Sequence, residues 1–312
     1  MPVTDQPTAP PTSRVLPYFC LGWVVLGLGF NWPILDVGVA SMPPLWLMTF
    51  RLLGGALVGF GMNAMVRRRA FIHRRDRRIV TVLGIFRLFA IFIFVFYALR
   101  ILPPGRSAIL VWTSTLWTVP IASIFLGERM SRLQTSGLVI GMLGMGVVVE
   151  PWELSFSEPR VIWGYLLITG AALSAAWTSV YIRGHSWTAS PLASTPWQML
   201  AGGVPAVAAA LAVEGMPDIQ WTWAVWGVVT YQATVAGPIV VWAHLTALRH
   251  IPVVPVNLTL MATPVVGLLA SWWWAEEIIT LTLVGGLVMI AAGVSANIFG
   301  DDHLRPHRSG MT

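Results

Sequence analysis

The stretch that decides the fold is residues 264–277, PVVGLLASWWWAEE, from Pro264 to Glu277. It is an apolar run that ends in two carboxylates, and a second apolar run, the glycine-rich residues 281–299, follows it. The same arrangement occurs 149 positions earlier, and this offset pairs Glu128 with Glu277, Gly137 with Gly286, Gly144 with Gly293 and residues 98–100 with 247–249. A constant offset over so long a stretch predicts that the chain consists of two copies of one unit.

The composition predicts a polytopic membrane protein. The chain is 56% hydrophobic and 10% charged, with a mean hydropathy of +0.73, whereas a soluble domain carries roughly 25% charged residues. Most of the charge lies between apolar runs of about twenty residues, the length that spans a hydrocarbon core. All nineteen basic residues are arginines, and membrane orientation explains their clusters, so we expect no nucleic-acid partner. The single cysteine, Cys20, excludes an intrachain disulfide.

Ten transmembrane helices are expected, arranged as two five-helix repeats. A Pro/Thr-rich tail, residues 1–15, should be disordered, and residues 300–312 form a second tail. The repeats cover residues 16–150 and 160–299. The predicted spans are residues 16–38, 44–66, 79–99, 105–126, 132–150, 160–182, 191–213, 221–248, 252–274 and 280–299.

The arginines predict the orientation. With a cytoplasmic N-terminus, the inner segments hold fourteen arginines and the outer loops three, and two more lie within spans. This excess predicts that both termini are cytoplasmic, as in a multi-pass protein of the plasma membrane (the bacterial inner membrane). Because each repeat has an odd number of helices, the second copy is inverted, which is the architecture of secondary transporters. The duplication alone does not exclude a channel.

Several short motifs, in order along nearly the whole chain, resemble the EamA-type transporters of the drug/metabolite transporter superfamily. They are Gly29-Phe30-Asn31-Trp32-Pro33-Ile34 (with Leu28 where the family has tryptophan), Pro44-Leu45-Trp46, Phe50-Arg51-Leu52-Leu53, Trp197-Gln198-Met199-Leu200, Leu126-Gly127-Glu128-Arg129, and Glu276-Glu277 with Leu281, Gly285, Gly286 and Gly293. The resemblance implies ten helices, a central cavity lined mainly by helices other than 5 and 10, and export of small metabolites by alternating access. One departure concerns the family's proline before the glutamate: Pro264 fits, but the first repeat has Thr115 there and Pro120 five residues later, which predicts a displaced kink in helix 4.

Three ionisable residues fall clearly within spans, and such residues are functional candidates by default. Arg87 is a candidate site for a carboxylate or phosphate group; alternatively, it bonds helix carbonyls or stacks on Phe86 or Trp112. Arg51 is expected to tie helices together. His244 is a proton carrier, a hydrogen-bond donor to substrate or a satisfied core histidine. Since no carboxylate is expected deep in the core, coupling through a buried carboxylate is not expected.

Aromatic and polar residues at similar depth complete the candidate site, although some are expected to hold helices together instead. The predicted substrate-binding residues are Asn31, Trp32, Arg87, Tyr97, Trp112, Thr115, Trp177, Tyr181, Tyr231, His244 and Asn257. The predicted gating or structural residues are Pro33, Arg51, Glu128, Pro238, Pro264 and Glu277. The glycine pairs Gly55/Gly59 and Gly137/Gly141 suit close helix packing, within one chain or in a homodimer.

These observations predict a secondary transporter that exports small amphipathic metabolites, amino acids or related carboxylate compounds, by alternating access. Its partners are the small-molecule substrate and the lipid bilayer. Two buried arginines without buried acids disfavour cationic substrates. The alternatives are an exporter of lipophilic drugs or other metabolites with the same fold, and a membrane scaffold or enzyme. A chain without lysine has no phosphate-binding loop, and neither a cofactor, a metal nor a catalytic group is expected.

Overall fold

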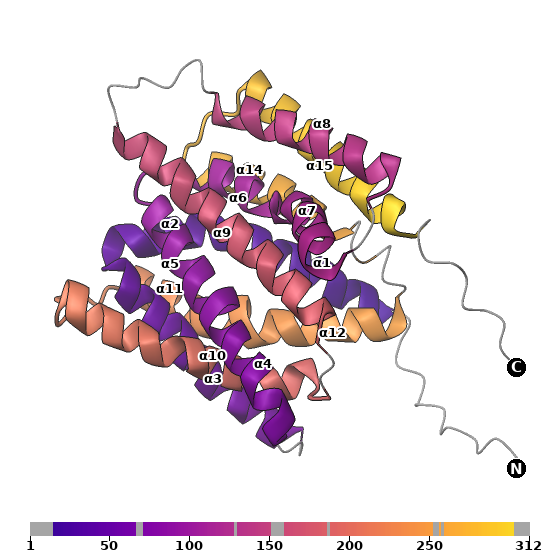
Figure 1. Ribbon diagram of the computed structural model, residues 1–312. Helices are drawn as coiled ribbons and strands as arrows, with labels where there is room; N and C mark the ends of the chain where they lie inside the picture. Colours follow the sequence, from indigo (N-terminus) through magenta and orange to yellow (C-terminus); the bar gives the residue numbers. More distant parts are fainter. Residues whose placement is uncertain are drawn as a thin grey trace, which may run out of the picture.

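The structure is a computed structural model that describes residues 15–66, 71–127, 130–150, 159–185, 188–251, 256 and 259–302. All regular elements in these ranges are helical, and the helices form one bundle (Figure 1). The expected all-α membrane fold is therefore confirmed. Two residues predicted above, Glu128 and Asn257, lie outside the described part of the chain.

The first five transmembrane helices come from residues 15–149. Helix 1 is α1 with α2, helix 2 is α3, helix 3 runs from η1 to α5, helix 4 is α6 with α7, and helix 5 is α8. The bounds are α1 Val15–Gly29, α2 Asn31–Ser41, α3 Pro44–Met65, η1 Arg74–Asp76, α4 Arg77–Val82, η2 Leu83–Ala90, α5 Ile91–Ala98, α6 Pro104–Trp112, α7 Ser114–Leu126 and α8 Arg132–Val149.

The second five come from residues 159–302. Helix 6 is α9, helix 7 is α10 with η3, helix 8 runs from α11 to α12, helix 9 contains α14, and helix 10 is α15. The bounds are α9 Pro159–Arg183, α10 Pro191–Ala209, η3 Ala210–Glu214, α11 Trp223–Thr234, η4 Val235–Ile239, α12 Val240–His250, α14 Ala262–Trp274 and α15 Leu281–Asp302. Among the described residues, nine helices are long and apolar enough to cross a membrane; α14 is the described part of the tenth.

The duplication is visible in the contact between α8 and α15, which lie side by side at one edge of the bundle (Figure 1). Gly137 faces Gly293, and Gly144 faces Gly286. The offset of 149 converts the first pair into the second, as expected for an inverted repeat. A methyl group at Gly144 would lie 2.9 Å from the Gly286 carbonyl oxygen, so the two backbones are in direct contact. These glycines pack within one chain and are not free to form a dimer face.

Helix 2 packs within the chain in the same way. A methyl group at Gly55 would lie 2.8 Å from the Met199 sulfur of helix 7, and one at Gly59 would lie 3.2 Å from Pro196 Cβ. The main hydrophobic core, which includes Leu47, Phe96 and Ile109, joins helices of both repeats.

Breaks divide helices 1, 4 and 9 at defined points. Helix 1 breaks at Phe30, three residues before Pro33, because proline has no N–H to donate to the preceding turn and its ring crowds that turn's carbonyl. Helix 9 has a turn at Met261, again three residues before a proline, Pro264. Shifting Met261 back by 149 gives position 112, and helix 4 breaks beside it, at Thr113.

The prediction that Pro120 displaces the helix 4 kink is therefore wrong. Pro120 lies inside α7, and the break occurs seven residues earlier, at Thr113. The Thr113 hydroxyl donates to the Leu110 carbonyl oxygen at 2.6 Å, and the Thr113 N–H donates to the same oxygen at 3.1 Å. The Thr113 side chain thus stabilises a tight turn that breaks helix 4, at the point of the repeat where helix 9 breaks near Pro264.

The bundle has two ends, which are named here for residues in their loops. The Glu277 end carries residues 42–43, 99–103, 215–222 and 275–280, and the Arg74 end carries residues 71–76, 184–185 and 188–190.

Candidate functional site

Arg87 lies in the middle of helix 3, within η2, a stretch of π-helix. The residue is exposed although it is far from either helix end, and its charged group is desolvated by the surrounding protein. In the described part of the chain, Arg106 and Glu150 form the one recorded ion pair, so no carboxylate is paired with Arg87. The charge of Arg87 acts on the ring of His244 in α12, so these two side chains lie near each other. A guanidinium in this setting is suited to an anionic ligand.

A column of aromatic rings begins beside Arg87 and runs along α9 toward the Arg74 end. The Phe86 ring lies 4.8 Å from Trp177, Trp177 lies 5.2 Å from Tyr181, and Tyr181 lies 4.0 Å from His185, measured between ring centroids. Trp177 and Tyr181 are half-buried and Phe86 is exposed. The column therefore offers ring faces at the level of Arg87.

Arg51 lies in a different network and is 4% exposed. Its guanidinium donates to the side-chain oxygens of Asn31 and Gln232 and, at 3.1 Å, to the Ala236 carbonyl oxygen in η4. It also stacks over Phe92 at 4.0 Å. The Gln232 amide donates to Asn31 at 3.0 Å, which closes the network. Arg51 thus joins helices 1, 2, 3 and 8 through neutral acceptors and an aromatic ring.

The other predicted residues occupy several environments. Trp32 is buried in the main core at 7% exposure. The Tyr231 hydroxyl donates to the Gly27 carbonyl oxygen and so joins helix 8 to helix 1. Trp112 and Thr115 are half-buried on either side of the break in helix 4. Pro33, Pro238 and Pro264 are all buried, and Pro238 lies within η4.

Glu277 caps a helix of the other repeat. Its carboxylate accepts from the Gly105 N–H at 2.7 Å and from the Arg106 N–H at 3.0 Å, the first free backbone donors of α6. The residues before them, Pro103 and Pro104, supply no side-chain cap. Burial raises the pKa of the Glu277 carboxyl, whereas the two backbone donors and the Arg106 charge act in the opposite direction. The Asp36 charge adds to the increase.

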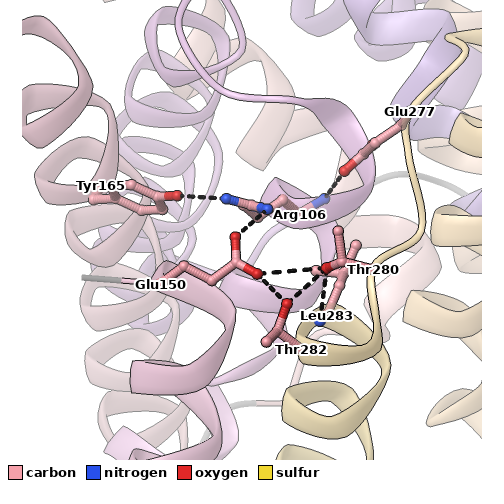
Figure 2. A network of polar contacts seen from close by, with 7 residues as sticks. All are labelled: Arg106, Glu150, Tyr165, Glu277, Thr280, Thr282 and Leu283. Atoms are coloured by element: carbon pink, nitrogen blue, oxygen red, sulfur yellow. Dashed lines mark hydrogen bonds and ion pairs between the residues drawn. The ribbon is translucent and has the colours of Figure 1, made fainter. Parts of the chain in front are cut away.

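The Arg106 side chain extends this contact across the Glu277 end (Figure 2). It pairs with Glu150 at 2.9 Å and donates to the Tyr165 hydroxyl at 3.1 Å. Glu150 also accepts from Thr280 and Thr282 at the start of α15. One cluster therefore joins helices 4, 5, 6 and 10 with the loop between helices 9 and 10.

Two further carboxylates bind backbone N–H groups of the other repeat, at a helix start or just before one. Glu214, at the end of η3, accepts from the N–H groups of Leu45 and Trp46 at the start of α3, at 3.1 and 3.3 Å. It also accepts from the Tyr97 hydroxyl at 3.2 Å, so Tyr97 lies in this contact.

At the Arg74 end, the buried Asp76 accepts from the Ala189 N–H at 2.9 Å and from the Thr188 hydroxyl at 2.8 Å. Thr188 and Ala189 lie just before helix 7. Asp76 thus makes the corresponding contact at this end, from the first repeat to the second.

The sequence analysis did not identify Arg106, Glu150, Tyr165, Glu214 or Asp76 as site residues. One signal was present, because the Pro-Pro pairs at positions 43–44 and 103–104 start helices whose first N–H groups need an acceptor from elsewhere. The identity of that acceptor, more than 160 positions away in each case, is not readable from local pattern.

Comparisons with known proteins agree with this architecture. The sequence model of the EamA-like transporter family matches residues 17–149 and 162–299. A "Probable amino-acid metabolite efflux pump" of Salmonella typhimurium is 27% identical over 89% of this chain and 93% of its own. An "Uncharacterized transporter YoaV" of Bacillus subtilis is 25% identical over 88% and 94%. One crystal structure of a protein superposes with a TM-score of 0.62 over 94% of this chain and all of that one, at 18% identity, which shows a shared fold.

Proposed function

Since the chain belongs to the EamA-like transporter family, a family of membrane transporters and not of enzymes, we propose that it exports small amphipathic metabolites by alternating access, namely amino acids or related carboxylate compounds. The observation that carries this proposal is the position of Arg87, an exposed residue in the middle of a membrane-spanning helix, with no acid paired to it in the described part of the chain. The similarity to a probable amino-acid metabolite efflux pump supports the same substrate class.

In this mechanism Arg87 binds the substrate carboxylate, because a guanidinium and a carboxylate form two parallel hydrogen bonds. The apolar part of the substrate packs against Trp177 and Tyr181, and His244 provides a further hydrogen-bond donor. Trp112 and Thr115 at the break in helix 4 extend the proposed site. The Arg87 charge disfavours a cationic substrate at this position.

The gates of the proposed cycle are the contacts at the two ends. Glu277 and Glu214 hold the Glu277 end, and Asp76 holds the Arg74 end. The proposed hinges are the buried Arg51 network, the breaks near Pro33 and Pro264, and the π-helical stretch η4 that contains Pro238. With both termini cytoplasmic, as the arginine distribution predicts, the Glu277 end faces the outside.

The test is efflux of labelled neutral amino acids from proteoliposomes, with and without an imposed proton gradient. Arg87→Gln should raise KM at least tenfold for a free amino acid and should not raise KM for its amide, which has no carboxylate. Arg78→Gln, an exposed arginine at the start of the same helix, is the matched control and should have no effect. Equal efflux of the acid by wild type and Arg87→Gln would refute the carboxylate role.

The same assay covers the alternative substrate classes. Saturable efflux of a lipophilic cation, insensitive to Arg87→Gln, would assign the protein to lipophilic drug export. Acceleration of amino-acid efflux by an inward proton gradient, lost in His244→Gln, would make His244 the coupling residue.

A further inference from the structure

Helices 3 and 8 each contain a π-helical stretch at the corresponding place in the repeat. Shifting η2, residues 83–90, by 149 positions gives residues 232–239, which include η4, residues 235–239. Stretches of π-helix are rare and frequently lie at functional sites. The duplicated position indicates that the widened turn belongs to the repeat unit itself.

In each widened turn, a side chain from another helix binds a backbone carbonyl oxygen. In helix 8 this oxygen belongs to Ala236, and the donor is the Arg51 guanidinium. In helix 3 it belongs to Phe86, and the donor is the hydroxyl of Ser174 on α9, at 2.7 Å. The two acceptors, Phe86 and Ala236, occupy neighbouring positions of the repeat, because Phe86 corresponds to position 235. External donors of this kind support an irregular turn that the helix's own N–H groups do not satisfy.

The Ser174 bond lies directly beside the proposed carboxylate-binding group, since Phe86 precedes Arg87 in the chain. Removing the extra residue from a π turn rotates the following side chains by about 100°, the angle between successive residues of an α-helix. The direction in which Arg87 points therefore depends on whether the turn stays widened.

We propose that Ser174 is a positioning residue for Arg87: its hydroxyl holds the widened turn of helix 3 open and thereby keeps the guanidinium directed at the substrate. This proposal rests on the proposed function for its consequence in transport, but its structural part stands apart from any substrate. Ser174 comes from the second repeat and Arg87 from the first, so a relative movement of helices 3 and 6 that broke this bond would turn Arg87 away from the substrate.

The structural part is tested by cysteine labelling in a Cys20→Ala background, which has no other cysteine. Single cysteines replace Phe86, Arg87 and Leu88 in turn, and their modification rates by a membrane-impermeant thiosulfonate are compared. With Ser174 present, position 87 should react faster than position 88. In Ser174→Ala the maximum should move to a neighbouring position, whereas Ser174→Thr, which keeps a hydroxyl, should retain the wild-type pattern.

Ser179→Ala is the matched control, because Ser179 lies on the same helix and, among the described residues, its hydroxyl bonds only to the Ala175 carbonyl oxygen of its own helix, at 2.9 Å. It should leave the labelling pattern unchanged. An unchanged pattern in Ser174→Ala, or a Ser174→Thr pattern displaced as in the alanine variant, would overturn the positioning role.

The transport part uses KM and kcat for a free amino acid and its amide, with Arg87 intact. Ser174→Ala should raise KM for the acid about fivefold, the effect of losing one hydrogen bond, with kcat and the amide unaffected. Two failures can be told apart. If Ser174→Ala displaces the labelling pattern but neither Ser174→Ala nor Arg87→Gln changes KM, the proposed carboxylate site is refuted and the positioning role remains. A displaced pattern and unchanged KM in a protein that does depend on Arg87 would overturn the role of Ser174 in transport.

Discussion

Replacing Glu277 with glutamine should make the Glu277 end open more often. The carboxylate accepts two backbone hydrogen bonds, at 2.7 and 3.0 Å, from the start of α6. Glutamine keeps one acceptor oxygen without a charge, so one donor loses its partner and the other loses the charge. A hydrogen bond to a charged group contributes about 1.5–3 kcal/mol, and removing a buried charge offsets part of this loss. The net change is about 1.5 kcal/mol in favour of the open end, or roughly tenfold in its population.

Ser107 is the position from which this opening can be measured. It lies two residues beyond Gly105, its side chain is fully buried, and its hydroxyl has no hydrogen-bond partner among the described residues. Cysteine at this position is close in shape to serine and should not disturb the packing. In a Cys20→Ala, Ser107→Cys background, an impermeant thiol reagent added on the Glu277 side should react about ten times faster when Glu277 is glutamine.

Glu276→Gln provides the control, because the neighbouring Glu276 is exposed. In the Ser107→Cys background it should leave the labelling rate at position 107 unchanged, as should reagent added on the Arg74 side. Equal rates in the Glu277→Gln and Glu276→Gln proteins would refute the conclusion that the cap holds this end closed.

Two further predictions concern packing and charge. Gly144→Ala should lower the free energy of unfolding by about 1–3 kcal/mol, since the added methyl group would lie 2.9 Å from a carbonyl oxygen of α15. Gly146→Ala on the same helix, with nothing within 4 Å of the added group, should leave the free energy of unfolding unchanged. Equal Tm values of the two variants in detergent would contradict the prediction. Arg106→Gln should cost about 2 kcal/mol of stability by leaving Glu150 buried without its cation, and an unchanged Tm would show that the pair contributes nothing.

The helices were predictable because membrane spans are read from length and hydropathy alone. Residues 105–126 were expected as one span, and the structure has α6 and α7 over Pro104–Leu126. The glycines at positions 137 and 144 were predictable as packing positions, because close helix contact requires small residues at this spacing. Arg87 was identified as a candidate because an arginine at mid-span is costly and therefore uncommon.

The irregular turns and the helix caps were not predictable. A widened turn differs from an α-helix by one residue, and the apolar run through Arg87 has no feature that marks it. Thr113 breaks helix 4 through a bond to its own backbone, whereas Pro120, the residue with the strong breaking preference, lies inside a continuous helix. Propensity thus pointed to the wrong position, because packing and a local hydrogen bond decided the outcome.

The carboxylate caps follow a pattern that connects the duplication to the proposed cycle. Glu214 and Glu277 belong to the second repeat and cap helices 2 and 4 of the first, at the Glu277 end. Asp76 belongs to the first repeat and binds the segment that leads into helix 7 of the second, at the Arg74 end. A helix start has free N–H groups and a partial positive charge, so a carboxylate from another helix stabilises it only while the two are in contact. A rocking movement of one repeat against the other must break and re-form the contacts that cross between the repeats at both ends. Substitutions of Glu277 and Asp76 should therefore favour opening at opposite ends of the bundle.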